Sequence, residues 1–357
     1  MRILFLSHHW TNNSHHSQYS GFQRLVVHAA KDNEVTLVTW GTEKTSYTDE
    51  HGINVVTIKG SKRDFLFLKR IAISLEGRRL ADGFDAVHAL YEDCTFFLKK
   101  NSYTVTFHVL PGIAVYRELK QKIFLFLKYN VLQRRAIRNA RNIVCVSTNL
   151  LDKIPEKHKG KARFIPHGID TDFWDPALPA APTLPAAAPV APATAAPPPG
   201  TPAKSYALCV GAHGLDRDLL TALINANPST RFVMVGLKNR LDEFPNVEYC
   251  SGISDEQLRT LYRNAETMLR PLIFATANNS VLEAMAMGRT ILASRIPGIT
   301  DYLNDSNCIF FDTMKDLSLE NVRSRKPDPG LIREFAVREF SWGSVLNAYY
   351  SLYLQKK

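Results

Sequence analysis

The sequence lacks the features that mark secreted, membrane-spanning and metal-stapled proteins. Its five cysteines are far apart and none forms a C-x-x-C pair; they are Cys94, Cys145, Cys209, Cys250 and Cys308. We therefore expect neither a disulfide framework nor a structural zinc site, and interpret the cysteines as small core residues. No apolar run reaches the roughly 18 residues that span a bilayer, and the opening MRILFLSHHW lacks the length and cleavage site of a signal peptide. These absences predict a cytoplasmic protein.

Two kinds of ligand-binding motif are also missing. No G-x-G-x-x-G follows the first strand-like run of either half, which disfavours an NAD-linked dehydrogenase. The segment after the first run contains His8, His9, His15 and His16. Neighbouring histidines cannot both point into one site from regular structure, and no carboxylate lies among them, so we expect no metal.

What is present predicts two α/β domains. A chain of 357 residues with 45% hydrophobic and 22% charged residues can bury two ordinary cores. Short aliphatic or β-branched runs alternate with helix-sized spacers, as in parallel sheets covered on both faces. The runs are RILFLS, EVTLVTW, NVVTI, AVHAL, YTVTFHV, NIVCVS and RFIPHG in the first half, and YALCVG, RFVMVG, VEYCSG, TMLRP, TILAS and CIFF in the second. Each half is predicted to be a doubly wound, Rossmann-like sheet.

The two halves are separated by residues 176–203, which consist almost wholly of Pro and Ala. Such a segment has too few large apolar side chains to form a core and favours extended polyproline conformation. We therefore predict a first domain over 1–175, a linker over 176–203 and a second domain from 204 onward. An insertion or a partner-binding PxxP segment is the alternative interpretation of the linker.

The positive charge lies mostly in the first half. Residues 1–175 contain 26 Lys and Arg against 17 Asp and Glu, a balance of +9, whereas residues 176–357 contain 18 against 17, a balance of +1. Residues 117–141 hold eight basic residues and one acid, interleaved with apolar and aromatic residues. This pattern is typical of a basic amphipathic helix that contacts an anionic membrane surface, or of a helix packed on the sheet with a solvated basic face. We expect no nucleic acid partner, and simple solubility is the remaining interpretation of the charge.

Candidate ligand-binding residues follow the strand-like runs, because open α/β sheets bind ligands beyond the carboxyl ends of their strands. Gly21 precedes a plausible helix, where backbone amides could approach an anion or a sugar. His108 ends one run and could donate to a sugar hydroxyl or to a developing negative charge; His88 ends another and has the same claim. In the second half, Gly211 leads into a helix whose first turn carries Arg217, a cation suited to a diphosphate.

The most specific segment is RPLIFATANNSVLEAMAMGRTILASRIPG. Its middle part predicts a polar cap followed by a short helix, whose start would present the amides of Asn279, Ser280 and Val281 to phosphate or sugar oxygens. Glu283 lies one turn further on, among apolar residues, and a charge there needs a polar partner, such as a pair of ribose hydroxyls.

At these segments the chain resembles the large family of retaining GT-B glycosyltransferases, which includes sucrose synthases, phosphatidylinositol mannosyltransferases and many capsule and lipopolysaccharide enzymes. The family's segment E-G-F-G-x-x-x-L-E-A-M-A-x-G, followed by a strand and P-G, is similar to ATANNSVLEAMAMG, TILAS and IPG here. Further similar segments are IPHGIDTDFW, VSTNLLDKI, SDEQLRTLYRNAETMLRP and FSWGSVLNAYYSLY. The resemblance implies a GT-B fold of two Rossmann-like domains facing a cleft, with the donor domain over 204–340 and residues 341–357 crossing back to the first domain.

The resemblance also implies roles for particular residues. Glu283 matches the glutamate that holds the ribose, and His108 matches the histidine that contacts the donor sugar. Arg217 would bind the diphosphate, and Gly21 matches the glycine loop that closes over it. Ala275 and Ala212 depart from the family's first glutamate and its arginine; Thr276 and Asn278 are expected to take over sugar contacts. The loops at Gly236 and Gly252 help to choose the base and the sugar.

The expected function is transfer of a sugar, with retention, from a nucleotide-diphosphate sugar to a glycan or lipid-linked acceptor in bacterial surface polysaccharide biosynthesis. UDP is favoured over GDP as the carrier. Because no D-x-D occurs in a suitable loop, we expect transfer without a metal or other cofactor. The alternatives are a nucleotide-sugar epimerase or hydrolase of the same architecture, and a catalytically degenerate binding partner, which Ala275 and Ala212 favour.

Overall fold

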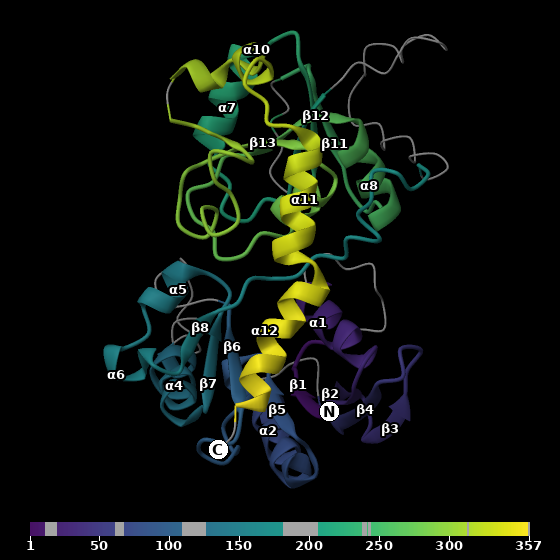
Figure 1. Cartoon of the computed structure of the whole chain (residues 1–357), viewed down its shortest axis with the longest axis vertical. Coiled ribbons are helices and arrows are strands. Elements are labelled where there is room, and N and C mark those ends of the chain that lie inside the picture. Colours follow the sequence, from purple (N-terminus) through teal and green to yellow (C-terminus); the bar gives the residue numbers. More distant parts are fainter. Residues whose placement is uncertain are drawn as a thin grey trace. The chain divides into compact units, whose positions relative to one another are not determined.

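The computed structural model describes residues 1–10, 20–60, 68–108, 126–180, 206–237, 241, 244–312 and 314–355. Within it the chain forms two compact units (Figure 1). The first unit combines Met1–His167 with Trp342–Lys357, and the second comprises Gly168–Ser341. The first unit is therefore built from two segments that are far apart in the sequence.

The first unit contains an eight-stranded sheet in the order β3-β4-β2-β1-β5-β6-β7-β8. All neighbouring strands run parallel except β3 and β4, which are antiparallel. The strands are β1 (Arg2–Leu6), β2 (Glu34–Gly41), β3 (Thr45–Thr48), β4 (Asn54–Lys59), β5 (Ala86–Ala89), β6 (Thr104–Phe107), β7 (Asn142–Cys145) and β8 (Ala162–Phe164). The apolar runs of the first half all form strands, whereas no pattern in the sequence predicted the polar edge strand β3.

Helices cover both faces of this sheet. They are α1 (Ser20–Ala30), α2 (Leu68–Leu80), η2 (Ala81–Gly83), η3 (Glu92–Cys94), η4 (Leu127–Gln133), α4 (Arg134–Asn139), α5 (Thr148–Asp152), α6 (Glu156–Lys159) and α12 (Trp342–Leu354). Helix α12 buries Trp342, Tyr349 and Leu352 in the same core cluster as Phe5 of β1 and Leu37 of β2. The last helix of the chain thus completes the core of the first unit.

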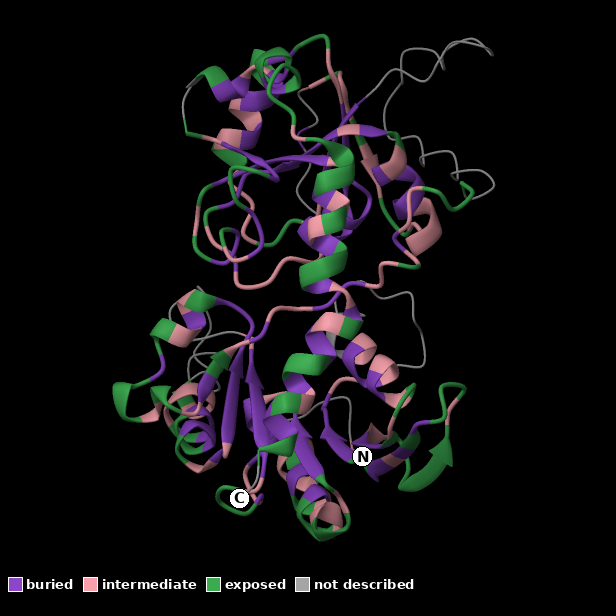
Figure 2. Cartoon of the chain, viewed as in Figure 1, coloured by how far each residue is buried: buried purple, intermediate pink, exposed green. Residues whose placement is uncertain are grey.

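The second unit contains a six-stranded sheet in the order β11-β10-β9-β12-β13-β14, with every neighbouring pair parallel. The strands are β9 (Tyr206–Val210), β10 (Arg231–Val235), β11 (Val247–Cys250), β12 (Ala265–Arg270), β13 (Thr290–Ala293) and β14 (Ile309–Phe310). The helices are α7 (Arg217–Ala226), α8 (Asp255–Asn264), α9 (Asn279–Ala286), η5 (Met314–Leu317), α10 (Leu319–Arg323) and α11 (Pro329–Phe340). The prediction of two doubly wound α/β domains is confirmed, and the central strands of both sheets are buried (Figure 2).

The first unit ends at His167 rather than at residue 175 because the next residues pack in the second unit. Ile169 and Trp174 join the core cluster that contains Tyr262, and the Trp174 and Tyr262 rings meet edge to face at 5.6 Å. Most of the linker predicted over 176–203 lies outside the described residues, which resume at Tyr206. Among the residues described, no helix combines the length and apolar character needed to cross a bilayer.

Candidate active site

Three loops of the second unit meet at the carboxyl ends of strands β9, β12 and β13. The loop after β9 pairs with the loop after β12 through an antiparallel bridge between Leu215 and Leu272. The Leu272 amide in turn donates to the hydroxyl of Ser294, which follows β13, at 2.8 Å. The central strands of the sheet therefore place these loops together, as the strand order requires.

Two glycines allow the loops to approach one another closely. Gly214 and Gly298 both have positive φ, at 70° and 85°. A Cβ at either position would lie 2.3 Å from a carbonyl oxygen of the middle loop, that of Phe274 for Gly214 and that of Ala275 for Gly298. Any larger residue would push the loops apart, so glycine is required at both positions.

The buried cation Arg270 fixes the end of β12 to the end of β9. Its guanidinium donates to the carbonyl oxygen of Val210 and, at 3.2 Å, to that of Gly211. Burial lowers the pKa of Arg270 from its usual value. Arg270 was predicted only as part of the strand-like run TMLRP, because nothing in the local pattern shows which carbonyl groups its side chain reaches.

Helix α9 begins beside these loops and is capped by Asn278. The side-chain oxygen of Asn278 accepts from the Val281 amide at 3.2 Å and from the Ser280 hydroxyl at 2.6 Å. The Val281 amide, which was predicted to serve a ligand, thus also donates to the helix cap. Asn279 and Ser280 occupy the first helical positions, and Thr276 lies half-buried in the preceding loop.

Glu283 is 6% exposed and does have the polar partner that its burial requires. The Tyr262 hydroxyl donates to Glu283 Oε2 at 2.9 Å, with the carbonyl oxygen of Ser280 as a second acceptor at 3.2 Å. Burial and the adjacent carboxylate raise the pKa of Tyr262 well above its usual value. Tyr262 was not singled out from the sequence, although it lies in the segment SDEQLRTLYRNAETMLRP.

The other second-unit candidates lie at the same edge of the sheet. Gly211 and Gly236 follow β9 and β10, have φ of 80° and 73°, and have no neighbouring atom within 4 Å of a Cβ position. Arg217 is the first residue of α7 and is exposed, and Asp216 caps that helix by accepting from the Leu219 amide at 3.0 Å. An exposed arginine at a helix N-terminus is suited to a phosphate.

The first unit places a row of aromatic rings at the carboxyl edge of its own sheet. The row consists of His8 and His9 after β1, Tyr91 after β5, His108 after β6 and His167 after β8. Ring centroids are 4.1 Å apart for His8 and His9, 4.3 Å for His8 and Tyr91, 5.5 Å for Tyr91 and His108, and 5.9 Å for His108 and His167. Exposed rings of this kind can stack on sugars and bind their hydroxyl groups, but His8 itself is buried. Tyr91 and His167 were not predicted; Tyr91 directly follows the run AVHAL, and His167 lies in the run RFIPHG.

The structure changes the chemical role open to His108. Its Nε2 lies 2.9 Å from the carbonyl oxygen of Leu90, so Nε2 carries the proton and donates it there. Burial, with a contribution from His167, lowers the pKa of His108 well below its usual value. The side chain is therefore a neutral imidazole whose Nδ1 accepts rather than donates.

The two other first-unit candidates differ from expectation. His88 is fully buried between the hydroxyl groups of Tyr353 and Thr106, at 2.6 and 2.7 Å, and burial lowers its pKa to about 3. It is a core residue of the first unit and does not line the edge of the sheet. Helix α1 begins at Ser20, so Gly21 lies within its first turn rather than before it. His15 and His16 are outside the described residues.

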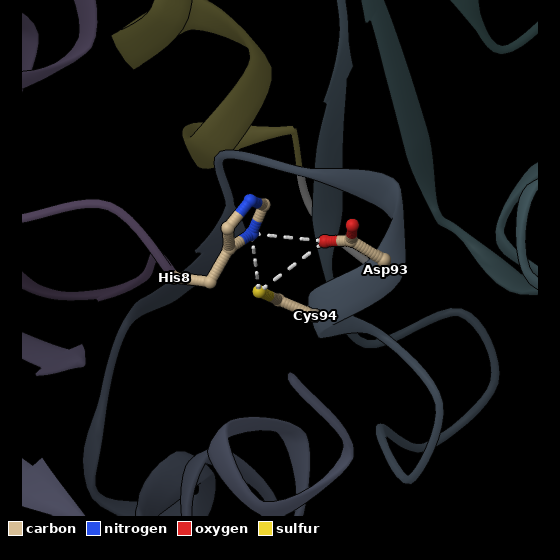
Figure 3. Close-up of side chains that lie close together, drawn as sticks. All are labelled: His8, Asp93 and Cys94. Carbon is tan, nitrogen blue, oxygen red and sulfur yellow. Dashed lines mark hydrogen bonds and ion pairs between the residues drawn. The ribbon is translucent and has the colours of Figure 1, made fainter. Parts of the chain in front are cut away.

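Two acids after β5 are buried and paired with cations. Asp93 contacts His8 Nδ1 at 3.1 Å (Figure 3). It also contacts Arg70 Nε at 3.0 Å, and Glu92 contacts Lys128 Nζ at 3.4 Å. Burial alone would raise the pKa of Asp93, but His8 and Arg70 hold it well below its usual range. The fold therefore brings to His8 a carboxylate that its neighbours in the sequence do not supply.

This geometry defines a two-unit α/β protein with the GT-B fold and with ligand-binding features at the strand ends. Two family models match the chain: "Glycosyltransferase Family 4" over residues 23–173 and "Glycosyl transferases group 1" over residues 212–318. These matches, one in each half, support membership of the GT-B glycosyltransferases. A comparison with curated proteins finds no match.

Solved structures with the same fold cover nearly the whole chain. Sucrose-phosphate synthase from Thermosynechococcus elongatus is 17% identical, with a TM-score of 0.71, over 99% of this chain and 98% of its own. Alr3699/HepE from Anabaena, solved in complex with UDP and glucose, is 11% identical with a TM-score of 0.65 over 99% of both chains. WaaG, a glycosyltransferase involved in lipopolysaccharide biosynthesis, is 13% identical with a TM-score of 0.63 over 98% of this chain and 99% of its own. At these identities the likeness concerns the fold.

Proposed function

We propose that this chain is a retaining glycosyltransferase that moves a sugar from a nucleotide-diphosphate sugar, UDP in preference to GDP, to a glycan or lipid-linked acceptor. The observation that carries the proposal is the meeting of three loops and the start of α9 at one sheet edge, with the buried Glu283 one turn into that helix. The preference for UDP is supported by the complex of HepE with UDP and glucose. The lipopolysaccharide role of WaaG supports a place in bacterial surface polysaccharide biosynthesis.

The donor would be held by the second unit. In this proposal Glu283 accepts from the ribose hydroxyls through the carboxylate oxygen that Tyr262 does not use. The amides at the start of α9 and the guanidinium of Arg217 offset the diphosphate charge, so no metal is needed. Thr276 and Asn278 contact the sugar, and Gly211 and Gly236 leave room for the nucleotide.

Transfer would depend on stabilising the leaving diphosphate more strongly in the transition state than in the ground state. In a retaining reaction of this type the acceptor hydroxyl attacks the face from which the diphosphate leaves. His108 would contribute as a neutral imidazole beside the donor sugar. Its Nε2–H contact with Leu90 holds the imidazole ring in place.

The described part of residues 117–141 supports a peripheral contact with anionic membrane on the cytoplasmic side. Phe126, directly before η4, is 62% exposed, and Val131, within η4, is 44% exposed; Arg134, Arg135 and Arg138 follow on α4. Apolar side chains next to a cationic helix suit an interface rich in acidic lipid. Sedimentation with vesicles should show binding to anionic but not to zwitterionic lipid, and the double change Phe126→Ser with Val131→Ser should weaken it.

Calorimetric titration of the purified protein with UDP, GDP, ADP and CMP, with and without EDTA, tests the donor site. UDP should bind with unchanged affinity in EDTA. Glu283→Ala should weaken UDP binding, whereas the control Glu266→Ala, at the amino end of β12 and paired with Arg323, should not. Equal affinity in the two variants would refute the ribose assignment.

Assays of the same protein with a radiolabelled donor separate the proposal from its alternatives. Sugar transfer that depends on an added acceptor supports the transferase, and Arg217→Ala should slow that transfer. Conversion of the donor without an acceptor would indicate an epimerase or hydrolase. Nucleotide binding without turnover would indicate a catalytically degenerate partner, in keeping with the buried methyl group of Ala275 in the second-unit core.

A further inference from the structure

Three side chains of different chemistry meet in the first unit and have no part in the proposed transfer. They are His8, which follows β1, and Asp93 and Cys94 of η3; we refer to them as the His8–Asp93–Cys94 cluster (Figure 3). Their exposures are 5%, 1% and 0%, so the cluster is shielded from solvent. It joins two segments more than eighty residues apart in the sequence, which is why no local spacing motif revealed it.

The three potential ligand atoms are separated by the distances expected around one tetrahedral zinc ion. His8 Nδ1 lies 3.1 Å from Asp93 Oδ1, and Cys94 Sγ lies 3.6 Å from His8 Nδ1 and 3.7 Å from Asp93 Oδ1. Zinc bonds of about 2.0–2.3 Å at tetrahedral angles give edges of about 3.3 Å between nitrogen and oxygen and about 3.6 Å from sulfur to either. The cluster therefore needs almost no rearrangement to surround the ion.

Hydrogen bonding alone does not use all three contacts. The Cys94 sulfur contacts both Asp93 and His8, but the thiol has one proton and can donate it to only one of them. The second of these contacts is therefore not a hydrogen bond from the thiol. We propose that the cluster binds Zn²⁺ through His8 Nδ1, Asp93 Oδ1 and Cys94 Sγ. Within the described ranges no fourth His, Cys, Asp or Glu joins the group, and a water molecule or a small ligand would complete the tetrahedron there.

The surroundings hold the ligand atoms in position before an ion arrives. Arg70 Nε contacts Asp93 Oδ2 at 3.0 Å, which directs the other oxygen, Oδ1, toward His8 and Cys94. The backbone of His8 is fixed because the Trp40 indole donates to its carbonyl oxygen at 2.9 Å. The Cys94 amide donates to the carbonyl oxygen of Tyr91 at 3.1 Å, which fixes the short helix η3.

The ligand set selects the metal. Thiolate and imidazole are poor ligands for Mg²⁺ and Ca²⁺, whereas one sulfur, one nitrogen and one oxygen suit Zn²⁺ and its analogue Co²⁺. Binding displaces the proton of the Cys94 thiol into solvent and forms a thiolate–metal bond. No step of the proposed transfer is assigned to this ion, and the inference holds whether or not the chain is a transferase.

The test uses the intact protein, freed of metal by dialysis against a chelator and titrated with Co²⁺ and then with Zn²⁺. We expect one Co²⁺ per chain with a thiolate-to-cobalt absorption band, loss of that band when Zn²⁺ displaces the cobalt, and a higher unfolding temperature in Zn²⁺. Metal content after gel filtration should be one zinc per chain.

Two matched variants locate the site. Cys94→Ala should remove the absorption band and lower the zinc affinity at least tenfold, whereas Cys145→Ala, a change at a buried cysteine of β7, should leave both as in the parent. The titration of the parent protein decides the matter even if Cys94→Ala fails to fold. Absence of the band in the parent, or its retention in folded Cys94→Ala, would overturn the proposal and leave the cluster as a hydrogen-bonded ion pair.

Discussion

Removal of one hydroxyl group, in Tyr262→Phe, tests how the second unit tolerates a buried carboxylate. The hydroxyl donates to Glu283 Oε2 at 2.9 Å, and Glu283 is almost completely shielded from water. A hydrogen bond to a charged acceptor contributes about 1.5–3 kcal/mol, and a buried group that loses its partner costs about the same. For a domain of this size each kcal/mol lowers the midpoint by about 2–4 °C, so we expect a loss of roughly 3–12 °C in the second-unit transition.

Calorimetric and urea unfolding of the parent, Tyr262→Phe, Glu283→Gln and the double variant would measure the interaction as a coupling energy. The expected coupling is above about 1 kcal/mol, because the phenylalanine variant leaves the carboxylate buried and the double variant does not. A coupling near zero, with Tyr262→Phe as stable as the parent, would show that Glu283 does not depend on this hydroxyl and would refute the reasoning.

Three further predictions concern the cores and loops of the two units. His88 has a pKa of about 3 in the folded protein against 6.5 for the free side chain. Below pH 6.5 the unfolded chain therefore binds a proton that the folded chain does not, so the free energy of unfolding falls by up to about 1.4 kcal/mol per pH unit as the pH decreases from 6.5 toward 3. Urea unfolding of His88→Gln against pH should lack that slope, and an unchanged slope would contradict the assignment. Gly298→Ala should destabilise the second unit by about 1–3 kcal/mol more than Gly211→Ala. Both glycines have positive φ, but of the two only Gly298 faces a carbonyl oxygen, that of Ala275. Equal unfolding midpoints of the two variants would exclude this clash. Trp342→Ala should destabilise the first unit by about 3–5 kcal/mol, measured by loss of its thermal transition, and a change below about 1 kcal/mol would mean that α12 is not part of that core.

The strands could be predicted because their cause is local. Segments such as RILFLS and YALCVG are unbroken apolar runs, and each forms a strand buried on both faces, β1 and β9. The strand β3 (Thr45–Thr48) was not predicted because TSYT is polar and each of its residues is exposed, and it is a strand only through antiparallel pairing with β4 at the sheet edge. This pairing depends on the neighbouring strand β4, so the residues of β3 do not reveal it.

The candidate site was predictable only where one segment determines it. The sequence favoured His88 and His108 equally as ligand-binding residues. In the structure His88 is buried in the core, where its Nδ1 contacts the hydroxyl of Tyr353, 265 residues away in the sequence. The Val281 amide was predicted to serve a ligand, and only the structure shows that it donates to the side chain of Asn278. Tyr91 stands beside His108 because β5 and β6 are neighbours in the sheet, and strand order is not encoded at either residue.

The divided first unit has a consequence for synthesis of the protein on the ribosome. Its sheet is translated before the second unit, whereas α12, which packs against that sheet, is translated after the second unit. At about 5–20 residues per second the gap lasts roughly 9–35 s. During that interval the apolar face that receives Trp342 and Tyr349 has no cover, while the second unit can already fold. The core of the half made earlier is therefore completed only after the second unit has been made.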